Sequence, residues 1–261
     1  MTRCSRGFAL LAALWLLVAL TAIAGVGVGI AQLGTLTTRN RVLLARAGWA
    51  REACAEILLA RYADDPTVRA VPRVDLGRGT WCAARVRDPG TAVHLDLADS
   101  ALLARLVADE FLGRAVLAQR AVTPFADPAE LWRLTDDTVL LGRLLPLVTT
   151  RGTGQVNLNV APVPVLRALP GFSEEVVQAV VHRRAIQPLQ SLDEVLGLVS
   201  AGSREALLAV YPDLMRTTTF APTQLIAVIE GGVAGTPIVS RATLTLVPVL
   251  ERLAVVRREV E

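Results

Sequence analysis

The two histidines are the first side chains to consider for catalysis, because histidine most often moves protons near neutral pH. His94 and His182 lie far apart in the chain, and neither has a cysteine, serine or carboxylate at a spacing typical of a catalytic site. The sequence also lacks a zinc-binding pattern, a P-loop and a nucleophile elbow. We therefore expect no enzymatic activity and no catalytic residue.

The cysteines could do redox chemistry. Cys4 lies in a short basic stretch at the start of the chain, whereas Cys54 and Cys82 form an even pair in its body. In an oxidising compartment, Cys54 and Cys82 are candidates for a disulfide. The alternative is that both are buried thiols, packed as small hydrophobic groups.

Neighbouring acidic residues could bind a cation. We interpret such pairs as solvated helix ends: Asp64-Asp65, Asp109-Glu110, Asp136-Asp137 and Glu174-Glu175. Asp136-Asp137 could also hold calcium, but no EF-hand spacing accompanies it. We expect no cofactor, with calcium left open and its ligands unassigned.

The first thirty residues carry the strongest signal in the sequence. Arg3 and Arg6 precede an uncharged apolar run that starts at Phe8 and continues past Ile30. The junction between Gly7 and Phe8 is typical of a prepilin peptidase site, at which the basic leader is removed and the apolar helix is kept. An ordinary signal peptide would instead lose its apolar segment.

Two other interpretations of this segment stay open. Residues 22–24 form a small-x-small site for a signal peptidase. Residues 8–33 could also be a plain transmembrane anchor, because they exceed the roughly 20 apolar residues that span a bilayer. In all three cases the N-terminal arginines favour a cytoplasmic N-terminus, so the bulk of the chain lies outside.

The helical pattern continues beyond the apolar run. One face repeats at three-to-four spacing through Ala47, Ala50, Cys54, Ile57, Leu58 and Arg61. Asp64-Asp65-Pro66 ends the helix. Strands are expected over 80–87, 217–230, 238–247 and 252–260, with a long helical stretch over 95–211.

These elements predict an α+β fold. A long N-terminal hydrophobic α-helix packs on a small antiparallel β-sheet, and a large α-helical domain is inserted between strands. We expect a leader at 1–7, a transmembrane or assembly helix at 8–62, an α/β core from 63–94 and 212–261, and the inserted domain at 95–211.

The inserted domain contains an internal repeat. Residues 94–98 resemble 157–161, and residues 120–131 resemble 184–195, with the offset changing by one residue between the two blocks. A solenoid needs at least three units. A duplicated helical hairpin is therefore expected.

The second copy carries Leu169-Pro170-Gly171-Phe172-Ser173 between two amphipathic segments, which is typical of a helix-hairpin-helix. Such a hairpin can bind DNA phosphates through backbone N–H groups, or can simply be a tight turn. All 27 basic residues are arginine, and a net charge of +3 spread along the chain does not indicate a nucleic-acid binder. Before the hairpin, Asn157 and Asn159 are interpreted as helix caps.

Together these segments resemble the K-type minor pseudopilins of the bacterial type II secretion system. The resemblance rests on the opening 6–11, the alanine-rich helix 47–61, the segment 156–162 leading to 166–171, and the block 188–194. It implies cleavage between Gly7 and Phe8, N-methylation of Phe8 and a single-pass inner-membrane protein with its bulk in the periplasm. The aspartate-rich stretch of the family is not recognisable here, so no calcium ligands are carried over.

The fifth residue of the expected mature chain is Ala12, where most pilin-like proteins have glutamate. An acid there pairs with the N-terminal amine of a neighbouring subunit, and a tip subunit would lack that partner. The resemblance therefore implies a tip cap that initiates assembly with I- and J-type minor pseudopilins, after processing by the prepilin peptidase. The alternatives are a membrane-anchored helix-hairpin-helix DNA-binding protein and a minor type IV pilin.

Overall fold

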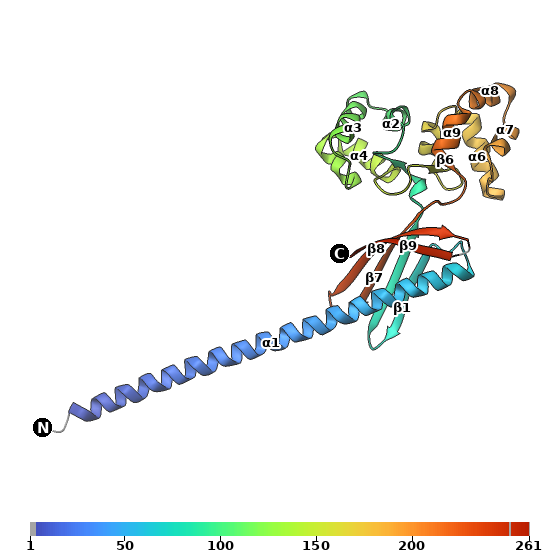
Figure 1. Ribbon diagram of the computed structural model, residues 1–261. Coiled ribbons are helices and arrows are strands. Elements are labelled where there is room, and N and C mark those ends of the chain that lie inside the picture. The colour runs from blue at the N-terminus through green and yellow to red at the C-terminus, as the bar shows by residue number, and fades with distance from the viewer. Residues whose placement is uncertain (1–3, 251, 261) are drawn as a thin grey trace.

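The computed structural model of the chain describes residues 4–250 and 252–260, with side chains from residue 11 onward. Helix α1 spans Cys4–Asp64, so its 61 residues make it about 90 Å long at the helical rise of about 1.5 Å per residue. Its N-terminal half projects away from the remainder of the chain, and its C-terminal part lies against a sheet (Figure 1).

The sheet has five antiparallel strands in the order β1-β2-β7-β8-β9. Their bounds are β1 (Ala70–Gly77), β2 (Thr80–Arg87), β7 (Leu225–Val233), β8 (Val239–Val249) and β9 (Arg252–Val260). Alternate residues of β2 face opposite sides, so Cys82 and Ala84 are buried while Arg85 and Arg87 are exposed. One face of the sheet therefore packs on α1 and the other faces away from it.

The first hydrophobic core lies between α1 and the sheet. The buried α1 residues are Ala47, Ala50, Cys54, Ala55, Leu58 and Tyr62. This confirms most of the predicted amphipathic face. The prediction was wrong for Arg61, which is exposed, because Tyr62 takes the last inward position.

The backbones of α1 and β7 approach one another very closely at Gly231. A Cβ atom built on Gly231 would overlap the backbone of Ala47 and Arg51. Next to this contact, Arg51 donates from Nη1 to Ser240 Oγ at 3.0 Å, and Glu52 forms ion pairs with Arg51 and with Arg258 of β9. These ion pairs, Arg51 first, lower the pKa of the Glu52 carboxyl below its ordinary value.

The inserted domain lies between β2 and β7 and consists of two halves. The first half contains η1 (Pro89–Thr91), β3 (Val93–His94), α2 (Ser100–Val107), α3 (Glu110–Val122), η2 (Pro128–Arg133), α4 (Thr138–Leu144), η3 (Leu145–Leu147) and β4 (Val148–Thr149). The second half contains β5 (Val156–Asn157), α5 (Val163–Ala168), α6 (Glu174–Ile186), α7 (Leu192–Gly197), α8 (Ala201–Ala209), α9 (Tyr211–Thr217) and β6 (Thr218–Thr219). Each half is closed by a short parallel pair, β3 with β4 and β5 with β6.

Equivalent arginines hold the two halves in the same way. Arg120 Nη1 donates to the carbonyls of Leu95 and Ala98 at 3.4 and 2.7 Å. Arg184 Nη1 donates to the carbonyls of Leu158 and Ala161 at 2.9 and 2.7 Å. The predicted duplication is therefore present in side-chain contacts as well as in sequence, including the one-residue change of offset.

The asparagine-rich segment 157–161 and its counterpart 94–98 in the first half also have matching roles. Asn159 Oδ1 accepts from Leu189 N at 2.8 Å, and its Nδ2 donates to Phe220 O at 2.7 Å. Asp96 Oδ1 accepts from Phe125 N at 3.1 Å. Our expectation that Asn159 caps a helix was wrong: α5 has Pro162 at its N-cap and no side-chain cap, and Asn159 instead ties distant loops together.

The predicted α+β fold class is confirmed, with three differences in detail. Strand β1 was not predicted, because Pro72, Arg73 and Asp75 interrupt its apolar pattern. The expected strand 217–230 starts only at Leu225, after the separate short strand β6. The inserted domain reaches Val93 and Thr219, outside the expected 95–211, because the closing strand pairs include these residues.

We predict that Gly231→Ala destabilises the chain by about 1–3 kcal/mol or more, because the added methyl group meets helix backbone that cannot rotate away. Gly142→Ala is the matched control, since a Cβ there meets no atom within 4 Å. Alanine inside α4 should leave stability unchanged or raise it by up to about 1 kcal/mol. Thermal unfolding of the detergent-solubilised chain measures both; equal melting temperatures for the two variants would contradict the close contact.

His94 predicts a pH dependence of stability. It is buried, and its Nδ1 accepts hydrogen bonds from the N–H groups of Asp96 and Leu97 at 3.2 and 3.3 Å. Burial lowers the pKa of His94 below its ordinary value of 6.5, although Asp96 opposes this. The folded state thus favours the neutral ring. This contribution to stability is complete above pH 6.5, the ordinary pKa of histidine, and it is lost as the pH falls through the lower pKa of His94 in the folded state.

We therefore expect the melting temperature to fall between pH 7 and 5, and to fall less in His94→Asn. Asparagine is the residue that the second half has at the equivalent position, where Asn157 Oδ1 accepts from Asn159 N at 3.1 Å. His182→Asn is the control, since His182 is exposed, and it should keep the wild-type profile. The same pH profile in His94→Asn as in the wild type would refute the role of His94.

Candidate functional site

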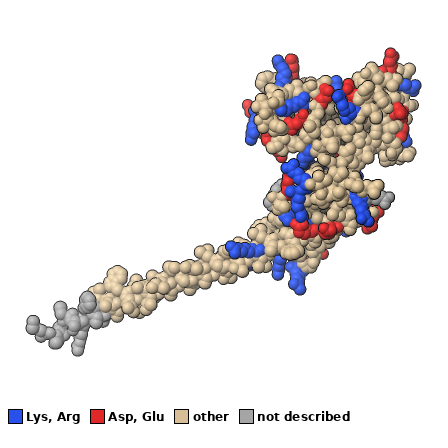
Figure 2. All heavy atoms as spheres, viewed as in Figure 1, with Lys and Arg blue, Asp and Glu red and all other residues tan. Residues whose placement is uncertain are grey.

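The candidate site is the projecting segment of α1, residues 11–46. Its large apolar side chains face outward, with Leu11 58% exposed, Trp15 66% and Ile23 69%. Among the described residues, α1 is the one helix long and apolar enough to cross a membrane, with a mean hydropathy of 2.4 in its most apolar window. Figure 2 shows this segment as an uncharged stem, with arginines appearing only close to the sheet.

The threonine hydroxyls of the projecting segment are satisfied within the helix. The hydroxyls of Thr21, Thr35, Thr37 and Thr38 donate to carbonyls one turn earlier, at 2.8–3.0 Å. The first carboxylate after Phe8 is Glu52, which already contacts the sheet domain. These threonines can therefore lie in lipid or against other apolar helices without an unpaired hydroxyl.

The predicted processing site lies at the start of this helix. Residues 1–3 of the expected leader are outside the described residues. Gly7 and Phe8 are within the backbone of α1, but their side chains are not described. Ala12 is the second residue whose side chain is described, and it is exposed on the projecting segment. Cleavage and N-methylation of Phe8 stay predictions.

The helix-hairpin-helix candidate is a packed turn. Gly171 has φ +75°, and a Cβ atom there would lie 2.8 Å from Val210 Cγ2 and 3.2 Å from the Ala206 carbonyl oxygen. The N–H groups of the turn are used internally, since Phe172 N donates to Leu169 O and Ser173 N donates to Gly171 O. These two N–H groups are therefore not available to a phosphate.

The charge at the hairpin also opposes phosphate binding. Glu174 and Glu175 occupy the first turn of α6. Arg167 contacts Glu174 through Nε and Nη2 at 2.9 and 3.0 Å, and this pairing lowers the pKa of Glu174 to about 2. Two carboxylates at the helix start would repel a DNA phosphate, so the geometry favours the interpretation as a structural turn.

The acidic pairs lie at helix ends. Asp109 accepts from Leu112 N at the start of α3, and Asp137 accepts from Val139 N and Leu140 N at the start of α4. Within residues 4–250 and 252–260, no three His, Cys, Asp or Glu side chains converge as a metal site would require. Calcium binding stays an expectation without assigned ligands, and we derive no role for it.

Cys54 and Cys82 are brought together although they come from different elements. Cys54 of α1 and Cys82 of β2 are both buried free thiols. Burial, followed by a hydrogen bond with Cys82, raises the pKa of the Cys54 thiol above its ordinary value. The pair is placed for a bridge between α1 and the sheet, and the disulfide itself stays a prediction.

Sequence reasoning missed the contacts that hold the inserted domain over the sheet. Asn157 Nδ2 donates to Asp88 Oδ2 at 2.7 Å in a buried position just after β2. Arg151 forms an ion pair with Glu259 of β9 at 2.8 Å. Asp88 precedes Pro89-Gly90, a sequence typical of a turn, and nothing in the sequence links Asp88 to a residue of the second half.

Comparison with known proteins gives a family match and a match in fold. Residues 156–211, most of the second half of the inserted domain, match the family described as type II secretion system (T2SS), protein K. The chain resembles a K-type minor pseudopilin. This confirms the resemblance that the sequence indicated, and it locates the family match on the hairpin and the asparagine-rich segment.

The similarity in fold to a type II secretion protein extends over most of the chain. A chain of the solved GspK–GspI–GspJ complex from the type 2 secretion system of enterotoxigenic Escherichia coli superposes with a TM-score of 0.62. The two chains share 16% identity, and the match covers 86% of this chain and 99% of the other. No curated protein sequence matches the chain.

Proposed function

We propose that the chain is a minor pseudopilin that caps the tip of a type II secretion pseudopilus and helps to initiate its assembly. In this role the prepilin peptidase cleaves between Gly7 and Phe8, and Phe8 becomes N-methylated. The projecting segment anchors the chain in the bacterial inner membrane, with the bulk in the periplasm. I- and J-type minor pseudopilins are its partners at the tip.

The projecting segment is the observation that carries the proposal. An apolar helix that is exposed over residues 11–46 and packed on a sheet beyond residue 47 needs an apolar environment for its first half only. A membrane supplies this before assembly, and the helices of neighbouring subunits supply it in a filament. A plain membrane anchor would explain the exposure but not the likeness to GspK in fold.

The shape of the chain supports a position at the tip. The inserted domain lies on the side of the sheet away from the projecting segment (Figure 1). The contacts of Asp88 with Asn157 and of Arg151 with Glu259 fix it there. A bulky domain held in this position would obstruct a further subunit stacked above it.

The alternatives are less well supported. A DNA-binding hairpin would need free N–H groups and basic side chains. Here the N–H groups of Phe172 and Ser173 bond within the hairpin, and two glutamates begin the next helix. A minor type IV pilin shares the leader and the first helix, but the family match lies in the inserted domain. The secretion role therefore accounts for more of the chain.

The proposal predicts which residue begins the chain isolated from membranes. We expect an intact mass and N-terminal sequence that start at Phe8, with a methyl group on its nitrogen. A start at residue 25 would mean a secreted protein without an assembly helix and would contradict the proposal. Masses before and after reduction also decide the disulfide, since a bridge between Cys54 and Cys82 gains two hydrogens when reduced.

The second prediction concerns Ala12. A carboxylate without a partner in an apolar assembly costs several kcal/mol, so Ala12→Glu should reduce secretion to near background in a complementation assay. Ala12→Gln has the same shape without the charge and should retain most of it. Secretion by Ala12→Glu at the wild-type level would contradict the tip position, provided that both variants accumulate in the membrane.

A further inference from the structure

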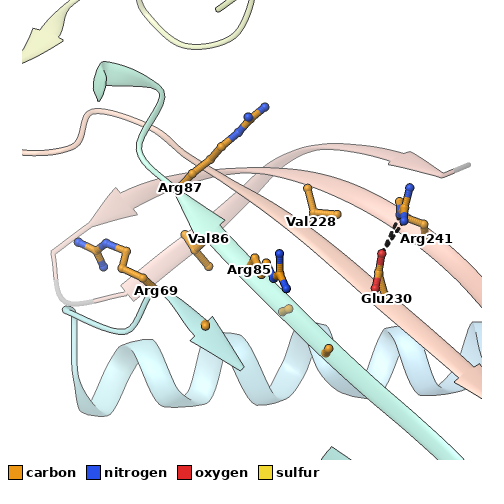
Figure 3. A pocket seen from close by; sticks show the side chains of 10 residues that line it. Arg69, Arg85, Val86, Arg87, Val228, Glu230 and Arg241 are labelled. Carbon is orange, nitrogen blue, oxygen red and sulfur yellow. Dashed lines mark hydrogen bonds and ion pairs between the residues drawn. The ribbon is translucent and has the colours of Figure 1, made fainter. Parts of the chain in front are cut away.

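The face of the sheet away from α1 carries an arginine-rich trough. It has a volume of about 780 Å³ and crosses β1, β2, β7 and β8. Small residues, Ala70 and Ala83, form part of its lining together with Val228, and arginines surround them, as Figure 3 shows: Arg69, Arg85, Arg87 and Arg241. The arginines of this trough take no part in the packing of α1 or in the proposed membrane anchoring.

Only some of the arginine charges of the trough are paired with an acidic side chain. Arg241 contacts Glu230 through Nε and Nη2 at 3.0 and 2.6 Å, so the one carboxylate of the lining is engaged. Arg69 Nη1 donates to the carbonyls of Pro66 and Val68 at 2.8 and 2.9 Å, which orients its charge without neutralising it. Arg85 and Arg87 are exposed, and no acidic side chain of the described residues forms an ion pair with either.

Other acidic side chains on this face of the sheet already have hydrogen-bond or ion-pair partners. Asp75, opposite Trp81 in the β1–β2 register, accepts from the N–H of Gly77 at 2.8 Å. Glu259, opposite Thr243, forms ion pairs with Arg151 and Arg257. Beyond the trough, the guanidinium of Arg73 lies 4.1 Å from the ring centre of Trp81. The face therefore has an excess of positive charge centred on β2.

The spacing of the two arginines suggests the shape of the ligand. Arg85 and Arg87 are alternate residues of β2, on the same face of the strand, so their stems are separated by about 6.6–6.8 Å. Alternate side chains of an extended peptide have the same separation. Guanidinium groups bind carboxylates in a bidentate manner with well-defined geometry. Carboxylates at positions i and i+2 of an extended segment would match the pair.

We propose that the trough binds an extended acidic segment of a partner protein, with its carboxylates on Arg85 and Arg87 and its backbone over Ala83 and Val228. Anionic lipid is a poorer match, because the trough lies on the sheet that packs against α1 beyond Ala47, whereas the uncharged run ends before Arg39. A separation of eight or more helical residues is about 12 Å or more. The proposal goes beyond the tip-cap role and does not depend on it.

The test uses the purified full chain in detergent and a fluorescein-labelled heptapeptide with glutamate and serine in alternation. We expect binding by fluorescence anisotropy that weakens with salt, and at least tenfold weaker binding by the Arg85→Gln/Arg87→Gln double variant. Arg85→Lys/Arg87→Lys should fall between the two, because it keeps the charge but not the bidentate geometry. The same peptide with glutamine in place of glutamate should not bind.

The matched control is Arg114→Gln/Arg133→Gln, which removes the same charge from exposed positions of the inserted domain, where these side chains are 73% and 78% exposed. It should bind the peptide as the wild type does. An equal loss in both double variants would show a non-specific charge effect and overturn the proposal. So would unchanged binding by Arg85→Gln/Arg87→Gln, or tighter binding of a single-stranded oligonucleotide or of glycerol phosphate at matched charge. If the peptide does not bind, the predictions for the N-terminal mass and for Ala12→Glu still stand, because neither depends on the trough.

Discussion

The contact between α1 and β7 at Gly231 is the constraint on which the rest of the structure depends. Because Gly231 has no side chain, the backbone of α1 around Ala47 and Arg51 reaches the sheet directly. This fixes where the packed part of the helix begins. The helix before it projects, and the helix after it has one face packed against the strands. The division of one helix into a projecting part and a packed part follows from this close approach.

The same contact determines which side chains meet. Gly231 lies opposite Cys82 in the register of β2 and β7, so the helix that crosses Gly231 also brings Cys54 to Cys82. The remaining face of β2 is then left to Arg85 and Arg87. The buried thiols and the arginine trough are thus two consequences of one alternating strand, with small groups toward the helix and long cations away from it.

The inserted domain shows how a duplicated sequence can keep its contacts while its residues change. Arg120 and Arg184 donate to equivalent carbonyls, whereas His94 and Asn157 differ in type and still accept an N–H from the residue two positions on. What is retained is the pattern of donors and acceptors. The imidazole of His94 keeps the turn that the amide of Asn157 makes, and it gives the first half a titratable group where the second half has none.

The sequence by itself determined the elements whose signal is local. The apolar run, the one-sided helix that follows it, the strand at 80–87 and the duplicated blocks each depend on residues close together in the chain, and each is present in the structure. The absence of an acid at Ala12 is also a property of sequence alone. Strand β1 was missed because Pro72 and Arg73 break the alternation that identifies a strand.

Only the tertiary structure decided the contacts between distant segments. The bonds of Asn159 to Leu189 and Phe220, the link between Asp88 and Asn157, and the trough that joins four strands all bring together residues separated by 30 or more positions. No local pattern encodes such pairs, because the polar groups involved look like turn residues or solvated charges until the chain has folded. Burial and strand register then give each of them a partner, or leave it without one.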